Sequence, residues 1–561
     1  MRRLFWIAVA SLAVVLLLAF AVWPLCLVVA RAVGLPEHFE PSRLITAFAA
    51  PQALAALLNT VLISTGVTVF AVLLGAPLGF VLSRTALPGA RRLKTYLTLP
   101  AVVPPYLLGI AWIDLANPRT GLLNAAGQIV NIYGIGGIIW VLGLCFYPFV
   151  LLPVATALER MDASLEESAR VAGAPPFTVF RQITLPLSLP AIVSGAVLVF
   201  LATAATFGVP YLLGTAGAVR TPVLTTAIVS EITVGGPESL GRAMALGVGL
   251  LLLSVVVALL GELATRAERR YAVVSGKGAR LRPMQLRPGT QRWLLLVLWA
   301  VVIVAVGLPL LTLLWVSLLK AWGAGLGPAN WSFDNYRRVL FQNHQTLPAT
   351  GDSMVLAVMA ASIAVAAGAT IAYLRSRRPG LLSSGLEALA NAPYSVPGTL
   401  LALGLLLAWS RELRFIFFER LTLALDLFSG VGALLVAYST KYLAFGVRVA
   451  KSGLVQIDRS LEEAARTSGA SALRTAFDVV VPLLLPSLGA AWLLVFLPVL
   501  SEITMSVLLV GPQTPVLGTV LFELQSYADP PSAAVVAVLL VVLTLGGNAV
   551  LRRATGGRGG F

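Results

Sequence analysis

The chain has 561 residues, of which 58% are hydrophobic and only 11% charged, and its mean hydropathy is +0.91. This composition excludes a water-soluble protein, because a soluble chain needs more polar residues on its surface. Twelve membrane helices of about 20 residues each leave room for loops but not for a further large soluble domain. The net charge of +16 would suit a nucleic-acid-binding protein. In so apolar a chain, however, it favours positively charged loops at the cytoplasmic face of a membrane. We therefore expect contacts with membrane lipid and none with nucleic acid.

Cysteine and histidine are scarce. Cys26 and Cys145 both lie within apolar runs, and His38 and His344 are the only histidines. These numbers exclude a disulfide framework, a cysteine-based metal site and a histidine cluster. We expect both cysteines to be buried as small apolar side chains.

The N-terminus resembles a secretory signal, because Met1, Arg2 and Arg3 precede an apolar run. The run continues to Ala30, however, and the apolar region of such a signal has only about 7–15 residues. We therefore interpret it as a retained first span. Together with it, apolar stretches of near-spanning length predict twelve spans, at about 5–31, 54–82, 97–115, 135–157, 188–209, 243–263, 293–319, 353–374, 388–409, 430–450, 487–510 and 533–551.

Positive residues fall unevenly on the loops. With the N-terminus inside, 28 of the 40 Lys and Arg residues lie in cytoplasmic segments, 11 lie in outer segments, and Lys441 lies within a span. The positive-inside rule then predicts that both termini are cytoplasmic. Residues 265–292 form a long polar stretch with Gly and Pro near the middle, which predicts a cytoplasmic linker between a first half, 1–264, and a second half, 293–561.

The two halves contain a repeated loop. DASLEESARVAGAPPFTVFRQITLPLSLP at 162–190 aligns without gaps to DRSLEEAARTSGASALRTAFDVVVPLLLP at 458–486, with 13 of 29 positions identical. Weaker echoes pair the region of Pro100 and Pro104 with that of Pro393 and Pro397, and TPVL at 221–224 with TPVL at 514–517. Six spans per half give both halves one orientation. The sequence therefore predicts an all-α membrane protein built as two parallel six-helix repeats about a pseudo-twofold axis along the membrane normal.

Each repeated loop is predicted to form a short helix outside the bilayer. Ser164 with Glu167, and Ser460 with Glu463, match the S-x-x-E capping box at a helix start. Gly173 and Gly469 should end the helices in a left-handed turn. Small residues at Ala169 and Ala465 leave space for close approach of another surface. Pro186, Pro190, Pro482 and Pro486 should separate the loop from the next span or lie in its first turn.

These loops resemble the EAA loop of bacterial ABC import permeases. The resemblance rests on Glu-Glu-Ser-Ala-(x)3-Gly and Glu-Glu-Ala-Ala-(x)3-Gly, each followed by Pro-Leu-(x)2-Pro, and Ser168 departs from the usual alanine. It implies a coupling helix that docks in a groove of a separate ATPase subunit. The implied coupling residues are Ser164, Glu166, Glu167, Ala169, Gly173, Ser460, Glu462, Glu463, Ala465 and Gly469.

Two permease halves in one chain, together with FGVPYLLGTAG at 207–217 and SEITMSVLLVGPQTPVLGTV at 501–520, are most similar to the ferric-iron import permeases. Similar fused chains serve thiamine, aminoethylphosphonate and phosphosugars, so these cargoes stay open. No Walker A motif is present in the sequence, so ATP and Mg are expected on two copies of a partner ATPase, with no cofactor on this chain. An extracytoplasmic substrate-binding protein is the other expected partner.

Ionisable and proline residues within spans are candidates for the pathway, because buried charge is costly in a membrane. Asp114, Lys441 and Glu502 are such residues, although Lys441 against a carboxylate also suits a structural ion pair and Asp114 a position near headgroup water. Pro100, Pro104, Pro393 and Pro397 interrupt the third and ninth spans, either as plain kinks or as bends that line a pathway. These residues make no cluster of oxygen ligands for Fe(III), so we expect iron coordination on a separate binding protein.

Two other classes of membrane protein are weaker alternatives. An ion-coupled secondary transporter also has parallel six-helix halves, but it does not require a duplicated capped loop, and this chain has few buried acids for ion coupling. A membrane-embedded enzyme needs an acid–base or metal constellation that the sequence lacks.

The charge distribution makes a testable prediction about orientation. A reporter fused after Arg553 should be cytoplasmic, and one inserted near Asn330 should lie outside, because the cytoplasmic loops hold the excess of positive charge. Reporter pairs that are active on opposite sides of the membrane would measure this. A cytoplasmic signal from Asn330 would overturn the orientation.

Overall fold

The computed structural model describes residues 11–35, 38–124, 127, 130–161, 163–215, 220–268, 284–323, 327–409, 413–417, 421–425, 431–511, 514–527 and 529–554. The chain forms two compact units. Unit 1 comprises Met1–Phe48, Ile228–Val248 and Ser317–Gly560, and unit 2 comprises mainly Ala49–Ala227 and Gly249–Val316. Each unit therefore contains segments from both halves of the sequence.

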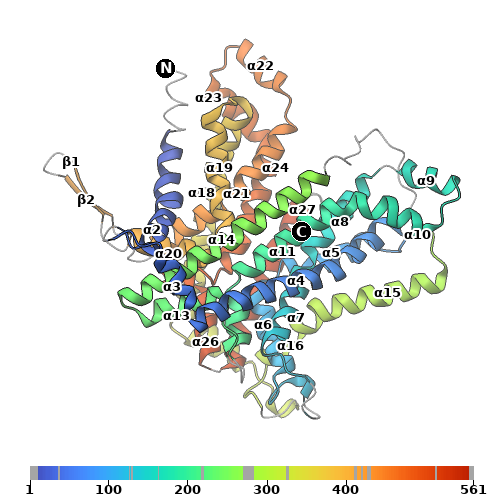
Figure 1. Ribbon diagram of the computed structural model, residues 1–561, viewed down its shortest axis with the longest axis horizontal. Coiled ribbons are helices and arrows are strands. Elements are labelled where there is room, and N and C mark those ends of the chain that lie inside the picture. The colour runs from blue at the N-terminus through green and yellow to red at the C-terminus, as the bar shows by residue number, and fades with distance from the viewer. Residues whose placement is uncertain are drawn as a thin grey trace. The chain divides into compact units, whose positions relative to one another are not determined.

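Helices account for nearly all elements (Figure 1). Up to the linker they are η1 (Leu18–Val22), α2 (Trp23–Ala32), α3 (Ser42–Ala49), α4 (Pro51–Arg84), α5 (Ala90–Thr98), η2 (Leu99–Ala101), α6 (Pro105–Ala116), η3 (Leu122–Asn124), α7 (Ile135–Phe146), α8 (Pro148–Arg160), α9 (Ala163–Val171), α10 (Pro176–Val179), η4 (Phe180–Thr184), α11 (Leu185–Ala205), α12 (Gly208–Thr215), α13 (Leu224–Val234) and α14 (Pro237–Glu268).

After the linker the same pattern returns. The elements are α15 (Pro288–Val302), η6 (Ile303–Gly307), α16 (Leu308–Ser317), η7 (Pro328–Asn330), α17 (Asp334–Arg337), η8 (Arg338–Gln342), α18 (Thr346–Arg377), α19 (Leu381–Ser395), α20 (Gly398–Trp409), β1 (Leu413–Phe417), β2 (Leu421–Leu425), α21 (Gly432–Val455), α22 (Arg459–Thr467), α23 (Ala472–Thr475), η9 (Ala476–Val480), α24 (Val481–Leu500), α25 (Ser506–Leu509), α26 (Leu517–Ser526) and α27 (Pro530–Ala554).

By length and composition, the described residues contain nine helices able to cross a membrane, or up to eleven when each of two bent helix pairs counts as one span. Eleven of the twelve predicted spans coincide with these. The remaining one, at about 430–450, is the 24-residue helix α21, in which Lys441 and Arg448 lower the apolar character. The exact number of twelve stays a prediction.

The predicted all-α class is confirmed, since helices make up most of the described residues. A short hairpin accompanies them, in which β1 and β2 pair antiparallel with Leu413 opposite Leu425; these runs contain Phe, Ile and Thr, which favour strands. One expectation is wrong: Cys26 is exposed, whereas Cys145 is buried as expected. An apolar residue of a membrane helix need not be buried in protein, because lipid is equally apolar.

In unit 2, the long helix α4 packs against α7, α8 and α11. Gly75 and Gly79 of α4 make the close approach to α8 possible. A Cβ on Gly75 would lie 2.6 Å from the carbonyl oxygen of Tyr147, and one on Gly79 would lie 2.9 Å from that of Leu151. Small residues at the contact let two membrane helices approach closely, so dispersion contacts can hold them together.

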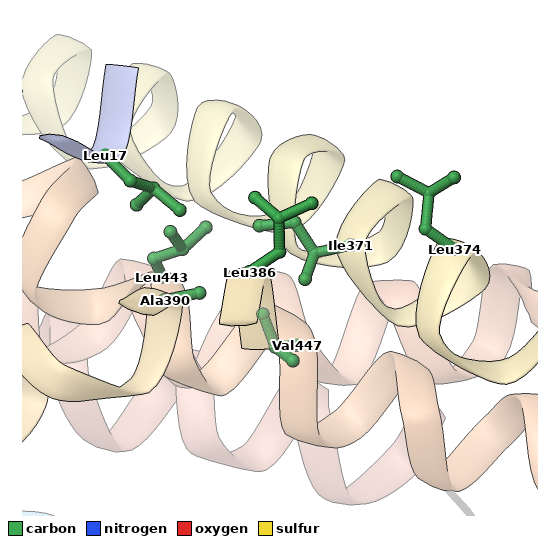
Figure 2. Packing of buried hydrophobic residues seen from close by; sticks show 7 residues of the cluster. All are labelled: Leu17, Ile371, Leu374, Leu386, Ala390, Leu443 and Val447. Carbon is green, nitrogen blue, oxygen red and sulfur yellow. The ribbon is translucent and has the colours of Figure 1, made fainter. Parts of the chain in front are cut away.

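Unit 1 repeats this packing with α18 against α21 and α24. A Cβ on Gly368 would lie 2.6 Å from the backbone of Gly446 and Val447. An apolar cluster lies between α18, α19, α21 and the N-terminal helix (Figure 2). Its buried members are Leu17, Ile371, Leu374, Leu386, Ala390, Leu443 and Val447.

The first helix of each half packs on elements of the other half. In unit 1, α2 contacts α20, and a Cβ on Gly404 would lie 2.9 Å from the carbonyl oxygen of Pro24. In unit 2, α15 contacts α5, and the rings of Tyr96 and Trp299 lie 5.6 Å apart. The boundary of the sequence halves at the linker stays a prediction, and the compact units differ from those halves by this exchange.

The α18–α21 contact predicts opposite effects for two glycines of one helix. Gly368→Ala should lower the free energy of unfolding by about 1–3 kcal/mol, because the added methyl group meets backbone that cannot rotate away. Gly351→Ala is the matched control, since nothing lies within 4 Å of its Cβ position. It should stabilise α18 by about 0.5–1 kcal/mol. Thermal unfolding of the purified protein in detergent measures both, and equal effects would contradict the close approach.

Candidate functional site

The two repeated loops fold alike. Gly173 lies two residues beyond the end of helix α9 and Gly469 two residues beyond the end of α22, with backbone φ angles of +86° and +89°. In the first loop the N–H of Gly173 donates to Arg170 and that of Ala174 to Ala169; in the second, Gly469 donates to Arg466 and Ala470 to Ala465, all at 3.0 Å. This pattern is the Schellman motif, in which a glycine beyond the helix end satisfies the last carbonyl groups. The predicted turn is confirmed at both sites.

The predicted start of these helices needs correction. Helix α22 begins at Arg459, and the carboxylate of Asp458 accepts the N–H of Ser460 at 2.9 Å. Asp458 is therefore the capping residue, and this hydrogen bond holds the pKa of its carboxyl below the usual range. Helix α9 begins at Ala163, so Ser164 also lies inside its helix. In the second loop, Asp458 competes better for the cap position than Ser460, the serine of the S-x-x-E pattern.

The first glutamate of each Glu-Glu pair is buried. In the first loop the Glu166 carboxylate lies 3.2 Å from Nη2 of Arg84, and its side chain is only 10% exposed. Thr184 donates its hydroxyl to the same carboxylate at 2.8 Å, and Arg170 lies 3.6 Å away. The loop is thus tied to the end of α4 by a buried charge pair with added hydrogen bonds.

The second loop repeats this arrangement. Nε of Arg377 lies 2.5 Å from the Glu462 carboxylate, and the two side chains are 10% and 5% exposed. Tyr373 donates its hydroxyl to Glu462 at 3.3 Å, and Arg466 lies 3.8 Å away. A guanidinium at the end of a long helix therefore meets a carboxylate of the short helix in both loops.

The second glutamate of each pair points the other way. Glu167 and Glu463 are exposed, as are Ser164 and Ser460, while Ala169 and Ala465 are partly exposed. Apolar side chains are exposed beside them in the first loop, with Val171 at 89% and Phe177 at 72%. Each short helix therefore presents a charged and partly apolar face outward, with one glutamate holding it to the membrane helices.

The prolines after the loops lie within continuous helices. The helix from Pro176 to Ala205 and that from Leu473 to Leu500 each contain a wider π turn, at Phe180–Thr184 and Ala476–Val480. Pro186 and Pro482 follow directly in the first turn of α11 and α24, where their missing N–H interrupts the hydrogen-bond pattern. Pro190 and Pro486 lie one turn further on, so these prolines do not separate the loop from the span.

The third and ninth spans are sharply bent, at the places that the prolines predict. The axes of α5 with η2 and of α6 differ by 89°, and those of α19 and α20 by 108°. Pro104 and Pro397 lie at the two breaks, and their carbonyl oxygens accept the first hydrogen bonds of α6 and α20, from Leu107 and Leu400, both at 3.0 Å. Pro100 and Pro393 precede the breaks. These are therefore broken helices rather than gentle kinks.

The structure brings Lys441 and Glu502 to the bend of the ninth span. A Cβ on Gly398, the first residue of α20, would lie 2.8 Å from Nζ of Lys441 and 3.3 Å from the side chain of Met505. The Glu502 carboxylate accepts the N–H groups of Met505 and Ser506, at 2.9 and 3.1 Å, and the Ser506 hydroxyl lies 2.7 Å from that of Tyr438. Glu502 thus caps α25. Among the described residues, no carboxylate lies within ion-pair distance of Lys441.

Asp114 lies in α6 and is only 1% exposed, which argues against the alternative in which its side chain reaches headgroup water. Within the part of the chain that the structure describes, its Oδ2 atom has no hydrogen-bond partner. Asp114 belongs to unit 2 and Lys441 to unit 1, and the described residues contain no group of three His, Cys, Asp or Glu side chains suited to a metal ion.

Sequence reasoning missed the partners of the buried glutamates. Arg84 and Arg377 each follow a serine at the end of an apolar span, 293 positions apart. That repeated Ser-Arg pair was the available signal. Thr60 and Ser353 were also missed; they have the same spacing, and each accepts a backbone N–H from the repeated TPVL segments.

The buried charge pair predicts unequal effects for neighbouring glutamates. Glu462→Ala should lower the free energy of unfolding by about 3–5 kcal/mol, because Arg377 stays buried without its carboxylate. Glu463→Ala, one residue away and exposed, should change it by about 0.5 kcal/mol or less. Thermal unfolding in detergent compares the two variants. A larger loss for Glu463→Ala would contradict the assignment.

Known proteins similar to this chain give consistent results. It is 25% identical to the Fe(3+)-transport system permease protein FbpB 2 of Haemophilus influenzae over 93% of this chain and 94% of that protein. It is 26% identical to the ferric transport system permease protein FbpB of Actinobacillus pleuropneumoniae over 85% and 68%. Over 36% of this chain it is 30% identical to the molybdenum transport system permease protein ModB of Escherichia coli, covering 90% of that protein.

Among solved structures, the inward-facing MetNI methionine ABC transporter matches 39% of this chain and 96% of its own, with 21% identity and a TM-score of 0.31. A bacterial alginate ABC transporter in complex with its alginate-bound periplasmic protein matches 48% and 98%, with 17% identity and a TM-score of 0.37.

The family model described as the inner membrane component of binding-protein-dependent transport systems matches twice, at residues 71–270 and 364–555. The two matches cover most of the chain, and each contains one of the repeated loops. The chain therefore belongs to this family, as a multi-pass inner-membrane transport subunit that carries two copies of the permease domain and is not itself an enzyme.

Proposed function

We propose that this chain is the membrane subunit of an ATP-driven importer of ferric iron. Its twelve spans form two parallel six-helix repeats, 1–264 and 293–561, joined by the linker at 265–292, with both termini in the cytoplasm. The pathway lies between the repeats and opens alternately to the outer and the inner face. Movement comes from two copies of a separate ATPase, which bind ATP and Mg.

The observation that carries the proposal is the pair of matching loops. Both have a buried glutamate that ties the short helix to a membrane helix, an outward glutamate next to it, and a glycine turn that ends the helix. A loop that served only as a connection would have no need to repeat this geometry. Two equivalent outward faces suit two copies of one ATPase, each held at one loop.

Ferric iron is favoured as cargo because the likeness to the two ferric permeases extends over 85% or more of this chain. Iron(III) needs several oxygen ligands, and we assign that coordination to an extracytoplasmic binding protein, in line with the name of the family. Thiamine, aminoethylphosphonate and phosphosugars are alternative cargoes from the resemblance of the loops. Molybdenum joins them, because the molybdenum transport system permease ModB matches 36% of this chain at 30% identity.

The bends and the polar groups near them are our candidates for the pathway. Pro104 and Pro397 break two spans, and carbonyl groups freed at such breaks need water or neighbouring helices as partners. Lys441 and Glu502 lie at one bend, and Asp114 lies on the helix that follows the other. An ion-gradient mechanism is less well supported, because few acids lie within the spans.

The test is reconstitution in vesicles with the cognate ATPase and binding protein. The chain alone should not hydrolyse ATP, and the complex should take up radioactive ferric iron when iron-loaded binding protein is outside. Glu463→Lys should reduce ATP-driven uptake by about fivefold or more, because it reverses a charge on the outward face that we propose docks on the ATPase. Folding should persist, since Glu463 is exposed.

Glu238→Lys is the matched control, because the Glu238 side chain is 94% exposed and lies at the start of α14, which belongs to neither repeated loop. It should leave uptake unchanged. ATP hydrolysis by the isolated chain at the rate of the complex, or full uptake in the Glu167→Lys, Glu463→Lys double variant, would refute the proposal. Uptake of molybdenum or thiamine in place of iron would change the proposed cargo and leave the rest of the proposed function in place.

A further inference from the structure

Two long helices, α4 and α18, hold equivalent polar contacts at both of their ends. At the C-terminal end, Arg84 and Arg377 contact the buried glutamates of the coupling loops. Near the N-terminal end, Thr60 and Ser353 contact the first residues of α13 and α26. The two contact points are 24 positions apart in each helix, which is about 36 Å at the helical rise of 1.5 Å per residue.

The contact near the N-terminal end is a cap supplied by another helix. The N–H of Leu224, the first residue of α13, donates to the hydroxyl of Thr60 at 2.9 Å, and that of Leu517, the first residue of α26, donates to Ser353 at 2.8 Å. Thr60 is 3% exposed and Ser353 4%. The first N–H groups of a helix have no partner within it, so a buried hydroxyl that accepts one fixes where that helix starts.

The contact at the C-terminal end joins three segments. Arg377 binds Glu462 of α22 through Nε and the carbonyl oxygen of Ile457, before α22, through Nη2 at 3.3 Å. Arg84 reaches Glu166 of α9 and the sulfur of Met161, the residue equivalent to Ile457, at 3.3 Å. In Figure 1, α22 lies near one end of the helices of unit 1 and α26 near the other.

We propose that α4 and α18 are the rods that carry movement of the coupling helices to the far side of the membrane, with Arg84 and Arg377 as the positioning residues that fasten them. An α-helix resists compression and bending over this length, because each turn is held by its own hydrogen bonds. A displacement of α22 therefore moves Arg377, α18 and the start of α26 together. This inference rests on the proposed function and identifies the helices through which the movement passes.

The experiment uses the full chain with its ATPase and iron-loaded binding protein in vesicles. It measures the number of iron ions taken up per ATP hydrolysed, together with binding of the ATPase. Arg377→Gln and Ser353→Ala should each lower this ratio about fivefold or more, while the ATPase still binds, because its docking face on α22 is unchanged. A purely structural role would lower the amount of inserted protein and leave the ratio intact.

The variant that combines both changes gives the most specific test of the rod. Changes at sites so far apart normally add. If α18 acts as a rod, loss of the contact at either end already stops the transmission of movement. The combined variant, Arg377→Gln with Ser353→Ala, should therefore lower the ratio of iron to ATP no further than either change alone. Arg474→Gln, which alters an exposed ion pair on the same loop, and Ser362→Ala, in the middle of α18, are matched controls that should keep the ratio of the unaltered chain.

Each outcome of the experiment either supports or overturns the proposed rod. An unchanged ratio in either single variant, or additive losses in the combined one, would overturn the rod. If Arg377→Gln does not insert into the membrane, Arg377→Lys takes its place. Lysine keeps the positive charge but cannot bind Glu462 and the Ile457 carbonyl oxygen through two separate nitrogen atoms. A lowered ratio of iron to ATP then supports the rod, and an unchanged ratio overturns it. Absence of ATP-driven uptake by the unaltered chain would instead refute the proposed function, and this inference with it.

Discussion

The structure depends on one constraint: in an apolar surrounding, each backbone N–H and C=O group must find a partner within the protein. Long continuous helices meet this requirement at every residue. Where a helix stops or breaks, the chain supplies a replacement acceptor, such as the carbonyl oxygens of Pro104 and Pro397 at the two bends or the hydroxyls of Thr60 and Ser353 at helix starts. Polar side chains within the spans thus serve as partners for backbone groups at such ends.

The two halves of the chain match in the arrangement of their helices but differ in several polar residues. The sharp bend, the π turn directly after the repeated loop and the arginine–glutamate pair occur once in each half. Lys441 and Glu502 have no charged counterpart in the first half, and Asp114 has none in the second. The linker adds a further difference, since Met284 pairs by backbone hydrogen bonds with Arg84 and Ala86 beside the first loop.

The sequence predicted features that depend on local chemistry. Apolar runs located the helices, glycine located both helix ends, and proline located both bends, because each effect acts within a few residues. The helix starts were wrong, since Asp458 competes with Ser460 for the cap. The partners of Glu166 and Glu462 lie 82 and 85 positions earlier in the chain, so only a comparison of the two halves, through the repeated Ser-Arg pair, could have indicated them. Assignment of helices to compact units depends on packing between distant segments and was likewise beyond the sequence.

The exchange of first helices constrains how the protein is made. Helix α2 leaves the ribosome early, yet its partner α20 is made more than 360 residues later, after the whole first half. The N-terminal helix must therefore wait in the lipid until the second half is inserted, and α5 must wait for α15. Because both halves belong to one chain, α2 and α5 pair with helices of the same molecule. Assembly therefore does not depend on association between separate chains.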